Sequence, residues 1–207
     1  MNATSSVEST RNPPHGCAFH RNLALCSRLI TSVLISVLCG GAVLPAQQQP
    51  SKPSEYQVKA AYLYNFGKFV DWSAASTADK DDSFSICVLG QDPFGAALDA
   101  TLAGQTVGGH KAIAKRISGP DEAGVCRILF ISSSEDTQLK EILPALNRSG
   151  ILTVSDIPQF SQRGGMIQFV TAENRIRFEV NLKAVEDAGL TLSSELLKVA
   201  VTVRKSS

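Results

Sequence analysis

The sequence predicts an α/β domain: a three-layer sandwich with a mostly parallel central sheet, helices on both faces and a C-terminal antiparallel hairpin at its edge. Two short apolar runs, Phe84–Leu89 and Arg127–Ile131, have the composition of strands that are buried on both faces. Helical and extended patterns alternate along the chain through residue 154, which is typical of a parallel sheet covered by helices. Two later segments, Met166–Val170 and Arg175–Asn181, are joined by a short turn and predict the hairpin.

The first helix is predicted over Glu55–Val70, because Ser54 and Gln57 have the spacing of a capping box and apolar residues recur at helical intervals. The residues that recur on its predicted buried side are Val58, Ala61, Tyr62, Asn65, Phe66 and Phe69. Further helices are expected over Phe94–Leu102 with Asp92 as its cap, over Glu135–Leu146, over Leu182–Ala188 and after Ser193-Ser194, and further strands over Lys111–Ile117 and Ile151–Val154.

The first 46 residues have the pattern of an export signal. Arg21 and Arg28 precede an uncharged run, Leu29–Leu44, which is short for a membrane span and suits the apolar part of a signal peptide. We therefore expect a leader over residues 1–46, a Gln/Pro/Ser-rich linker over 47–54 and an exported domain over 55–203. Cleavage near Ala42 and an uncleaved anchor helix are the alternatives.

Composition sets bounds on function. The chain has 207 residues, of which 43% are hydrophobic, enough for one domain with a sizeable core. Its formal net charge is +1, and no basic stripe is visible along the sequence. These features argue against nucleic acid as the partner.

The cysteines predict a disulfide. Of the five cysteines, only Cys87 and Cys126 lie beyond the predicted leader. Cys87 lies within a predicted buried strand and Cys126 immediately precedes another, and an even pair in an exported domain favours a bond between them. Two buried free thiols are the alternative.

The sequence offers little for catalysis. His110 is the only histidine beyond the predicted leader, and no Gly-x-Ser-x-Gly motif accompanies it. Structural zinc requires about four Cys or His ligands, which this domain does not supply, and no calcium-loop motif occurs. We therefore expect no catalytic residue, no metal and no cofactor, and a hydrolase that uses His110 is the least favoured interpretation.

Aromatic and leucine-rich segments predict a docking surface. The first helix has more aromatic residues than one buried face requires, and Tyr64 falls away from the stripe of Phe66 and Phe69. The segment Leu190–Leu197 likewise has more apolar residues than one short helix buries. Exposed apolar surface of this kind marks partner sites. The predicted partner-binding residues are Tyr62, Tyr64, Trp72, Leu190 and Leu192.

Several segments, in this order, resemble the YfiR/HmsC-like family. They are Tyr56–Trp72, Phe84–Gly90, Gly164–Phe169, Arg175–Leu182 and Ala188–Lys198, and the resemblance covers about residues 55–203. It implies a periplasmic α/β protein without catalytic activity. The best-known member is a dimer that represses an inner-membrane diguanylate cyclase by binding the periplasmic sensor domain of that enzyme, and an outer-membrane partner relieves the repression.

The resemblance also bears on the cysteines, because Cys87 and Cys126 match the first family disulfide in context and order. A second family pair, nearer the C-terminus, has no counterpart in this sequence.

We therefore expect a periplasmic regulatory protein that docks on a membrane sensor, restrains cyclic di-GMP synthesis and forms a homodimer. The alternative is a periplasmic small-molecule-binding protein that uses the crevice beyond the strand ends near Gly90 and Ser132–Ser134.

Overall fold

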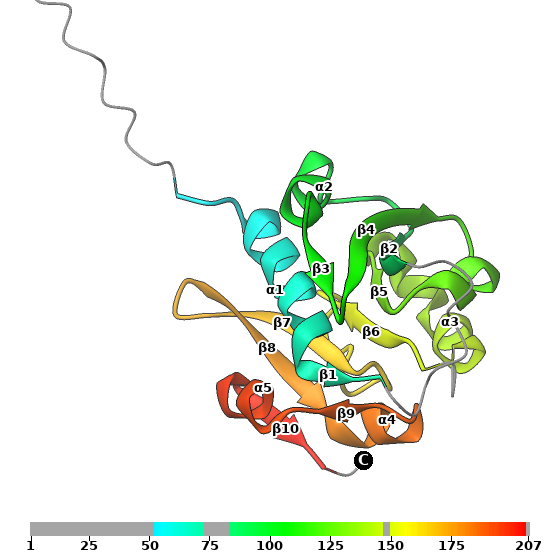
Figure 1. The fold of residues 1–207 in the computed structure, drawn as a ribbon. Coiled ribbons are helices and arrows are strands. Elements are labelled where there is room, and N and C mark those ends of the chain that lie inside the picture. Colours follow the sequence, from blue (N-terminus) through cyan, green and yellow to red (C-terminus); the bar gives the residue numbers. More distant parts are fainter. Residues whose placement is uncertain (1–51, 73–82, 147–149, 206–207) are drawn as a thin grey trace, which may run out of the picture. The chain divides into compact units, whose positions relative to one another are not determined.

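The computed structural model describes residues 52–72, 83–146 and 150–205, which form a mixed sheet with helices packed against it (Figure 1). The strands of this sheet are β2 (Ser83–Leu89), β3 (Thr106–Val107), β4 (His110–Ile117), β5 (Ile128–Ile131), β6 (Leu152–Ser155), β7 (Ile167–Ala172), β8 (Arg175–Asn181) and β10 (Thr202–Arg204). The α-helices are α1 (Glu55–Phe69), α2 (Ala96–Leu102), α3 (Leu139–Ala145), α4 (Leu182–Asp187) and α5 (Ser194–Val199), and two 3₁₀ helices are η2 (Pro120–Val125) and η3 (Ser133–Gln138). A separate two-stranded sheet pairs β1 (Val70–Asp71) with β9 (Thr191–Leu192).

The predicted fold class is confirmed. The strand order is β10-β8-β7-β6-β5-β2-β4-β3, and the strands from β4 through β2, β5 and β6 to β7 are parallel. The antiparallel hairpin is β7–β8, as expected, but β10 pairs with β8 in parallel and forms the outer edge beyond it. At the opposite edge, β3 adds a short antiparallel strand that the sequence pattern did not predict.

Strand β2 divides the interior into two cores. Ile86 and Val88 point into a large core with residues of α1 and α2, whereas Cys87 and Leu89 point into a smaller core with residues of η2 and α3. Alternation of side chains along a strand produces this division. The β2 strand is buried along nearly its whole length, as its composition predicted.

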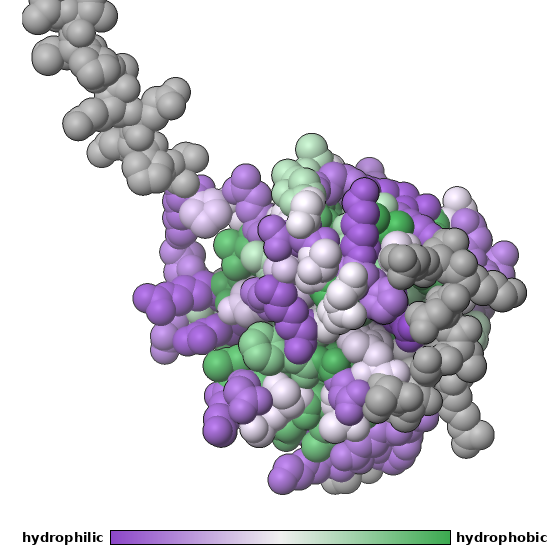
Figure 2. All heavy atoms as spheres, in the orientation of Figure 1, coloured by the Kyte–Doolittle hydropathy of each residue, from purple (hydrophilic) through white to green (hydrophobic). Residues whose placement is uncertain are grey.

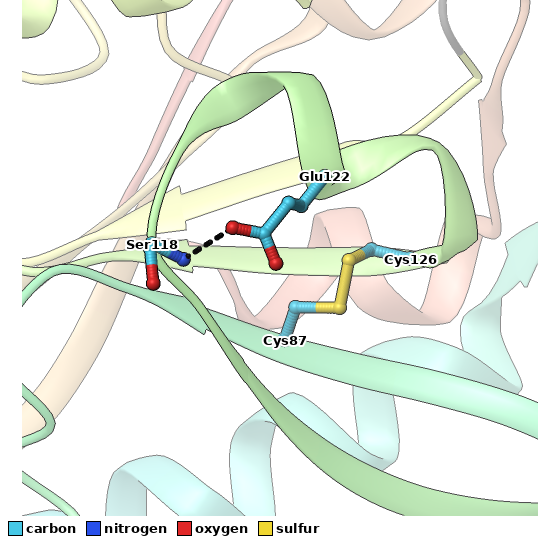
Figure 3. Close-up of a disulfide and its surroundings, with 4 residues drawn as sticks. All are labelled: Cys87, Ser118, Glu122 and Cys126. Atoms are coloured by element: carbon cyan, nitrogen blue, oxygen red, sulfur yellow. Dashed lines mark hydrogen bonds between the residues drawn. A yellow bond between two sulfur atoms is a disulfide. The ribbon is translucent and has the colours of Figure 1, made fainter.

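The smaller core contains the predicted disulfide. Cys87 in β2 is bonded to Cys126, which lies between η2 and β5, and their Cα atoms are 5.8 Å apart. Figure 3 shows the bond beneath η2, where the Glu122 carboxylate accepts a hydrogen bond from the Ser118 amide (3.1 Å). The bond therefore fastens the segment that connects β4, next to the edge strand β3, with β5 near the centre of the sheet.

Two predicted helices differ from the observed ones. The helix expected from Phe94 begins at Ala96, because the Asp92 carboxylate accepts a hydrogen bond from the Phe94 amide (2.8 Å) and also pairs with Arg116 (2.9 Å). A loop with Gly95 at a positive φ of 53° therefore precedes α2. The helix expected over Glu135–Leu146 consists of η3 followed by α3, with Pro144 inside α3.

Helix α1 begins as predicted but buries a different face. The capping box is present: the Gln57 amide donates to the Ser54 hydroxyl, and the Ser54 amide donates to the Gln57 side chain (2.7 Å). Of the six residues on the predicted buried side, only Phe66 is buried, and Phe69 is exposed. The residues that α1 buries are Lys59, Ala60, Leu63, Phe66 and Gly67.

Two features explain this orientation of α1. At Gly67 the helix lies so close to the sheet that an added Cβ would be 3.0 Å from the Phe84 ring. At Lys59, whose side chain is only 3% exposed, the ammonium group pairs with Asp156 (2.6 Å) and Glu55 (2.5 Å). A buried charge is tolerated when it is paired in this way.

The surroundings of Lys59 keep it protonated. Burial alone would lower the pKa of Lys59, but hydrogen bonds to Asp156 and Glu55 outweigh burial and raise that pKa above its usual value. The Tyr56 hydroxyl donates to the same Asp156 oxygen (3.1 Å), and burial together with the nearby Asp156 charge raises the pKa of Tyr56. The contacts of Tyr56 and Lys59 with Asp156 thus join α1 to the loop that follows β6.

We expect Lys59→Met to lower the free energy of unfolding by about 3 kcal/mol, because it leaves the Asp156 carboxylate without its cation in a partly buried site. Because the pKa of Lys59 is raised, the contribution of this group is present in full at neutral pH and is lost only above the lysine value of 10.5. Chemical denaturation at pH 7 measures the change.

The matched control is Lys183→Met. Lys183 pairs with Asp187 at 2.7 Å, but both side chains are about half exposed, so we expect a loss of about 0.5 kcal/mol or less. The double variant Lys59→Met/Asp156→Leu should recover stability relative to Lys59→Met, since neither charge then remains. Equal losses for Lys59→Met and Lys183→Met would contradict this account of α1.

The disulfide should contribute about 4 kcal/mol to stability, according to the chain-entropy estimate for a loop of this length. We expect the Cys87→Ala/Cys126→Ala variant to unfold at correspondingly lower denaturant. Alkylation of the unfolded protein followed by intact-mass measurement tests the bond itself. Neither thiol of this pair should react until a reductant is added, and alkylation of both without reductant would show that the bond is absent.

Candidate functional site

The structure places Tyr62 and Tyr64, two predicted partner-binding residues, on different sides of α1. Tyr62 is half-buried, packs edge-on against Phe178 with ring centroids 5.7 Å apart, and donates a hydrogen bond to the carbonyl of Ile176 (3.3 Å). The Tyr64 hydroxyl instead donates to the Gln105 side chain (2.8 Å) before β3. Tyr64 therefore lies apart from Tyr62, and its half-buried ring packs against the larger core.

The remaining predicted residues lie mostly inside the fold. Trp72 donates a hydrogen bond to the carbonyl of Gly67 (3.2 Å) and packs edge-on against Phe84. Leu190 and Leu192 are buried in the larger core. The expectation that Leu190 and Leu192 belong to exposed apolar surface is wrong, because β9 pairs with β1 and draws the segment against the end of α1. Contact of Trp72, Leu190 and Leu192 with a partner stays a prediction.

Exposed apolar residues occur instead at the end of α1 and at the end of α5, two helices that contact each other. Among the described residues, the large apolar side chains that are most exposed are Phe69 (40%), Val199 (54%), Val201 (47%) and, on η2, Val125 (46%). The Ser193 amide, at the start of α5, donates to the carbonyl of Phe69 (2.9 Å) and brings the two helices together. Figure 2 shows apolar side chains on this part of the surface. We call Phe69, Val199 and Val201 the α1–α5 face.

A shallow hollow of about 230 Å³ lies beside Phe69. Its other lining residues are Lys68, Val70, Asp71, Thr191, Leu192 and Ser193. Leu192, although buried, thus borders the hollow. The surroundings have both signs of charge, with Lys68 and Lys198 against Asp71 and Glu195. Hydrogen bonds from the backbone of Glu195 and from Ser193 and Ser194 lower the pKa of the Glu195 carboxyl. An apolar centre with a polar rim is the usual anatomy of a protein–protein interface.

Directly over Gly90, the crevice expected beyond β2 is filled by side chains of η3. The Gln91 amide donates to the Ser134 hydroxyl (3.0 Å), and a Cβ added to Gly90 would lie 2.4 Å from that oxygen and from a Glu135 carboxylate oxygen. A small molecule would have to displace these side chains to lie directly over Gly90.

Neither a metal-binding cluster nor a membrane-spanning helix occurs among the described residues. His110 lies half-buried at the start of β4, in the β3–β4 hairpin. Within residues 52–72, 83–146 and 150–205, no group of three His, Cys, Asp or Glu side chains is arranged to hold a metal ion. The helices of the same segments are too short or too polar to cross a bilayer. The predicted leader and its apolar run Leu29–Leu44 lie outside the described residues.

Two solved structures have a limited similarity to this chain, at low sequence identity. A conserved domain protein from Vibrio cholerae O1 biovar El Tor is 12% identical, with a TM-score of 0.49 over 74% of this chain and 62% of that chain. The ABC domain in complex with L-Trp from Streptococcus pneumonia is 11% identical, with a TM-score of 0.44 over 64% of this chain and 59% of that chain. The chain thus spans less than two thirds of either structure.

The family comparison identifies the family of the chain. A family model described as YfiR/HmsC-like matches residues 56–201, from the first turn of α1 to the residue before β10. The match includes both cysteines of the disulfide, the α1–α5 face and every strand of the main sheet except β10. The chain therefore belongs to the YfiR/HmsC-like family, whose members are periplasmic regulators rather than enzymes.

Proposed function

We propose that this protein restrains cyclic di-GMP synthesis by docking on the periplasmic sensor domain of a membrane-anchored diguanylate cyclase. The observation that carries the proposal is membership of the YfiR/HmsC-like family over residues 56–201. The chain is exported by its N-terminal leader, acts as a homodimer and is released from the sensor by an outer-membrane partner. It uses no cofactor and performs no catalysis.

The docking surface is the α1–α5 face. Phe69, Val199 and Val201 are among the most exposed large apolar side chains of the described residues, and the hollow beside Phe69 gives a partner side chain a place to enter. A few anchors of this kind carry most of the energy of an interface. Tyr64 contributes at the margin, whereas Tyr62, Trp72, Leu190 and Leu192 support the surface mainly from beneath.

We expect Phe69→Ser/Val199→Ser to abolish repression while the protein stays folded. Truncating two central anchors should weaken binding by at least about 2 kcal/mol, or roughly thirty-fold. Both side chains are substantially exposed, so the melting temperature should change little. Titration of the purified cyclase sensor domain gives the dissociation constant, and cellular cyclic di-GMP reports repression.

Val125→Ser is the matched control, because Val125 is equally exposed but lies on η2, near the disulfide. It should bind and repress as the unchanged protein does. Sedimentation of each variant shows whether self-association uses the same face: a double variant that becomes monomeric and still binds the sensor assigns the face to the homodimer. Unchanged binding and repression by a folded, dimeric double variant would refute the proposed surface.

A further inference from the structure

A cavity of about 350 Å³ lies beyond the carboxyl ends of three neighbouring parallel strands. Ser133 follows β5, Asp156 follows β6, and Phe169, Val170 and Thr171 belong to the last part of β7. Glu55 and Lys59, in the first turns of α1, complete the lining together with Ile176 of β8. Ligands of open α/β sheets bind in this position, outside the carboxyl ends of the strands.

The charged side of the cavity has an excess of negative charge. Lys59 is paired with both Glu55 and Asp156, so its ammonium group is already satisfied. Asp156 accepts from Lys59 and Tyr56 through the same oxygen, Oδ2, and no described residue donates to its Oδ1. Glu55 is 53% exposed at the rim. Two carboxylates therefore face one ammonium group, and their remaining oxygens can accept from a further cation.

The opposite side of the cavity is apolar. Phe169 is buried, and Ile176 is half-buried on the same face of the sheet, because it pairs with Thr171, two residues after Phe169. The arginines that flank Ile176 along β8 alternate to the other face of the sheet, so they do not line the cavity. A volume of this size lies at the lower end of the range for small-molecule sites, and an apolar wall with a few polar groups is their usual composition.

We propose that this cavity binds a small organic cation, with an amine or guanidine head on Glu55 and Asp156 and an apolar body against Phe169 and Ile176. The need to neutralise Lys59 does not explain why a second carboxylate, Glu55, lies beside Asp156. The Lys59–Asp156 pair is sufficient to neutralise the buried ammonium group, whereas an exposed carboxylate such as Glu55 adds little to stability. The site lies at the opposite end of α1 from Phe69, roughly 20 Å away along the helix.

Three probes of similar size test the proposed charge preference. They are 2-phenylethylamine, its neutral analogue 2-phenylethanol and the anion 3-phenylpropionate, each titrated into the purified protein and followed by calorimetry and by NMR shifts. We expect the amine to bind at least about ten-fold more tightly than the alcohol, since it adds charge-assisted hydrogen bonds, and the anion to bind least. Shifts should be confined to residues around the cavity.

Two variants separate binding from folding. Glu55→Gln should weaken binding of the amine about three-fold, because it removes one partly exposed charge, and should leave the melting temperature nearly unchanged. Ser133→Phe places a large side chain at the cavity without touching the Lys59–Asp156 pair, and should abolish binding. Asp187→Asn, a change of the same type at a carboxylate outside the cavity, should leave the affinity for the amine unchanged.

The site is refuted if the amine does not bind, if the anion binds as well as the amine, or if Ser133→Phe binds the amine as the unchanged protein does. These results are independent of the proposed repression, because the readout is binding of a small molecule to the isolated protein. Loss of repression in the Phe69→Ser/Val199→Ser variant with intact amine binding would show that the two surfaces act separately.

Discussion

The burial of Lys59 against Asp156 determines how the first helix lies on the sheet. An ammonium group removed from water requires partners, and the carboxylates that supply them come from the first residue of the helix and from the loop after β6. With Lys59 held inward, Ala60, Leu63 and Phe66 also face the sheet, and Phe69 is left at the surface. The exposed apolar face and the cavity at the strand ends are therefore two consequences of the same placement of α1.

The disulfide has a corresponding role on the other face of the sheet. The η2 segment that connects β4 to β5 buries Ala123 but none of its other residues, so it contributes little apolar area to the smaller core. Short 3₁₀ segments also form weaker hydrogen bonds than α-helices. A covalent bond from Cys126 to the centre of β2 fixes this connection where packing alone would hold it weakly. The larger core is held by the packing of its aromatic and aliphatic residues, so it does not depend on a covalent bond.

Patterns that are local in sequence predicted most of the architecture. The buried strands, the capping box at Ser54 and the pairing of Cys87 with Cys126 all depend on composition, short-range spacing or a simple count. The orientation of α1 was not predictable in this way, because a lysine and a glycine occupy its buried face while Val58 and Phe69 occupy more exposed positions. Hydropathy alone would place Lys59 and Gly67 on the exposed side of the helix and Val58 and Phe69 on its buried side.

Long-range contacts account for the part of the site that the sequence did not predict. The pairing of β1 with β9 joins two-residue strands far apart in the chain, and neither has a local signal. This pairing buries Leu190 and Leu192, which the sequence suggested were available to a partner. A carboxylate directly after a buried strand, together with a lysine in an apolar helix, was the available signal for the cavity.

Ser193 links the two helices of the α1–α5 face. Its amide donates to the carbonyl of Phe69, which is the last residue of α1, and its hydroxyl accepts from the Leu196 amide as the N-cap of α5. Because β1 follows α1 without a connecting loop, Phe69 is held between the end of the helix and the start of a strand. The backbone around Phe69 is thus fixed before any partner arrives, and a fixed anchor loses less conformational entropy on binding than a mobile one. An exposed aromatic residue on so constrained a backbone is better suited to recognition than one on a free loop.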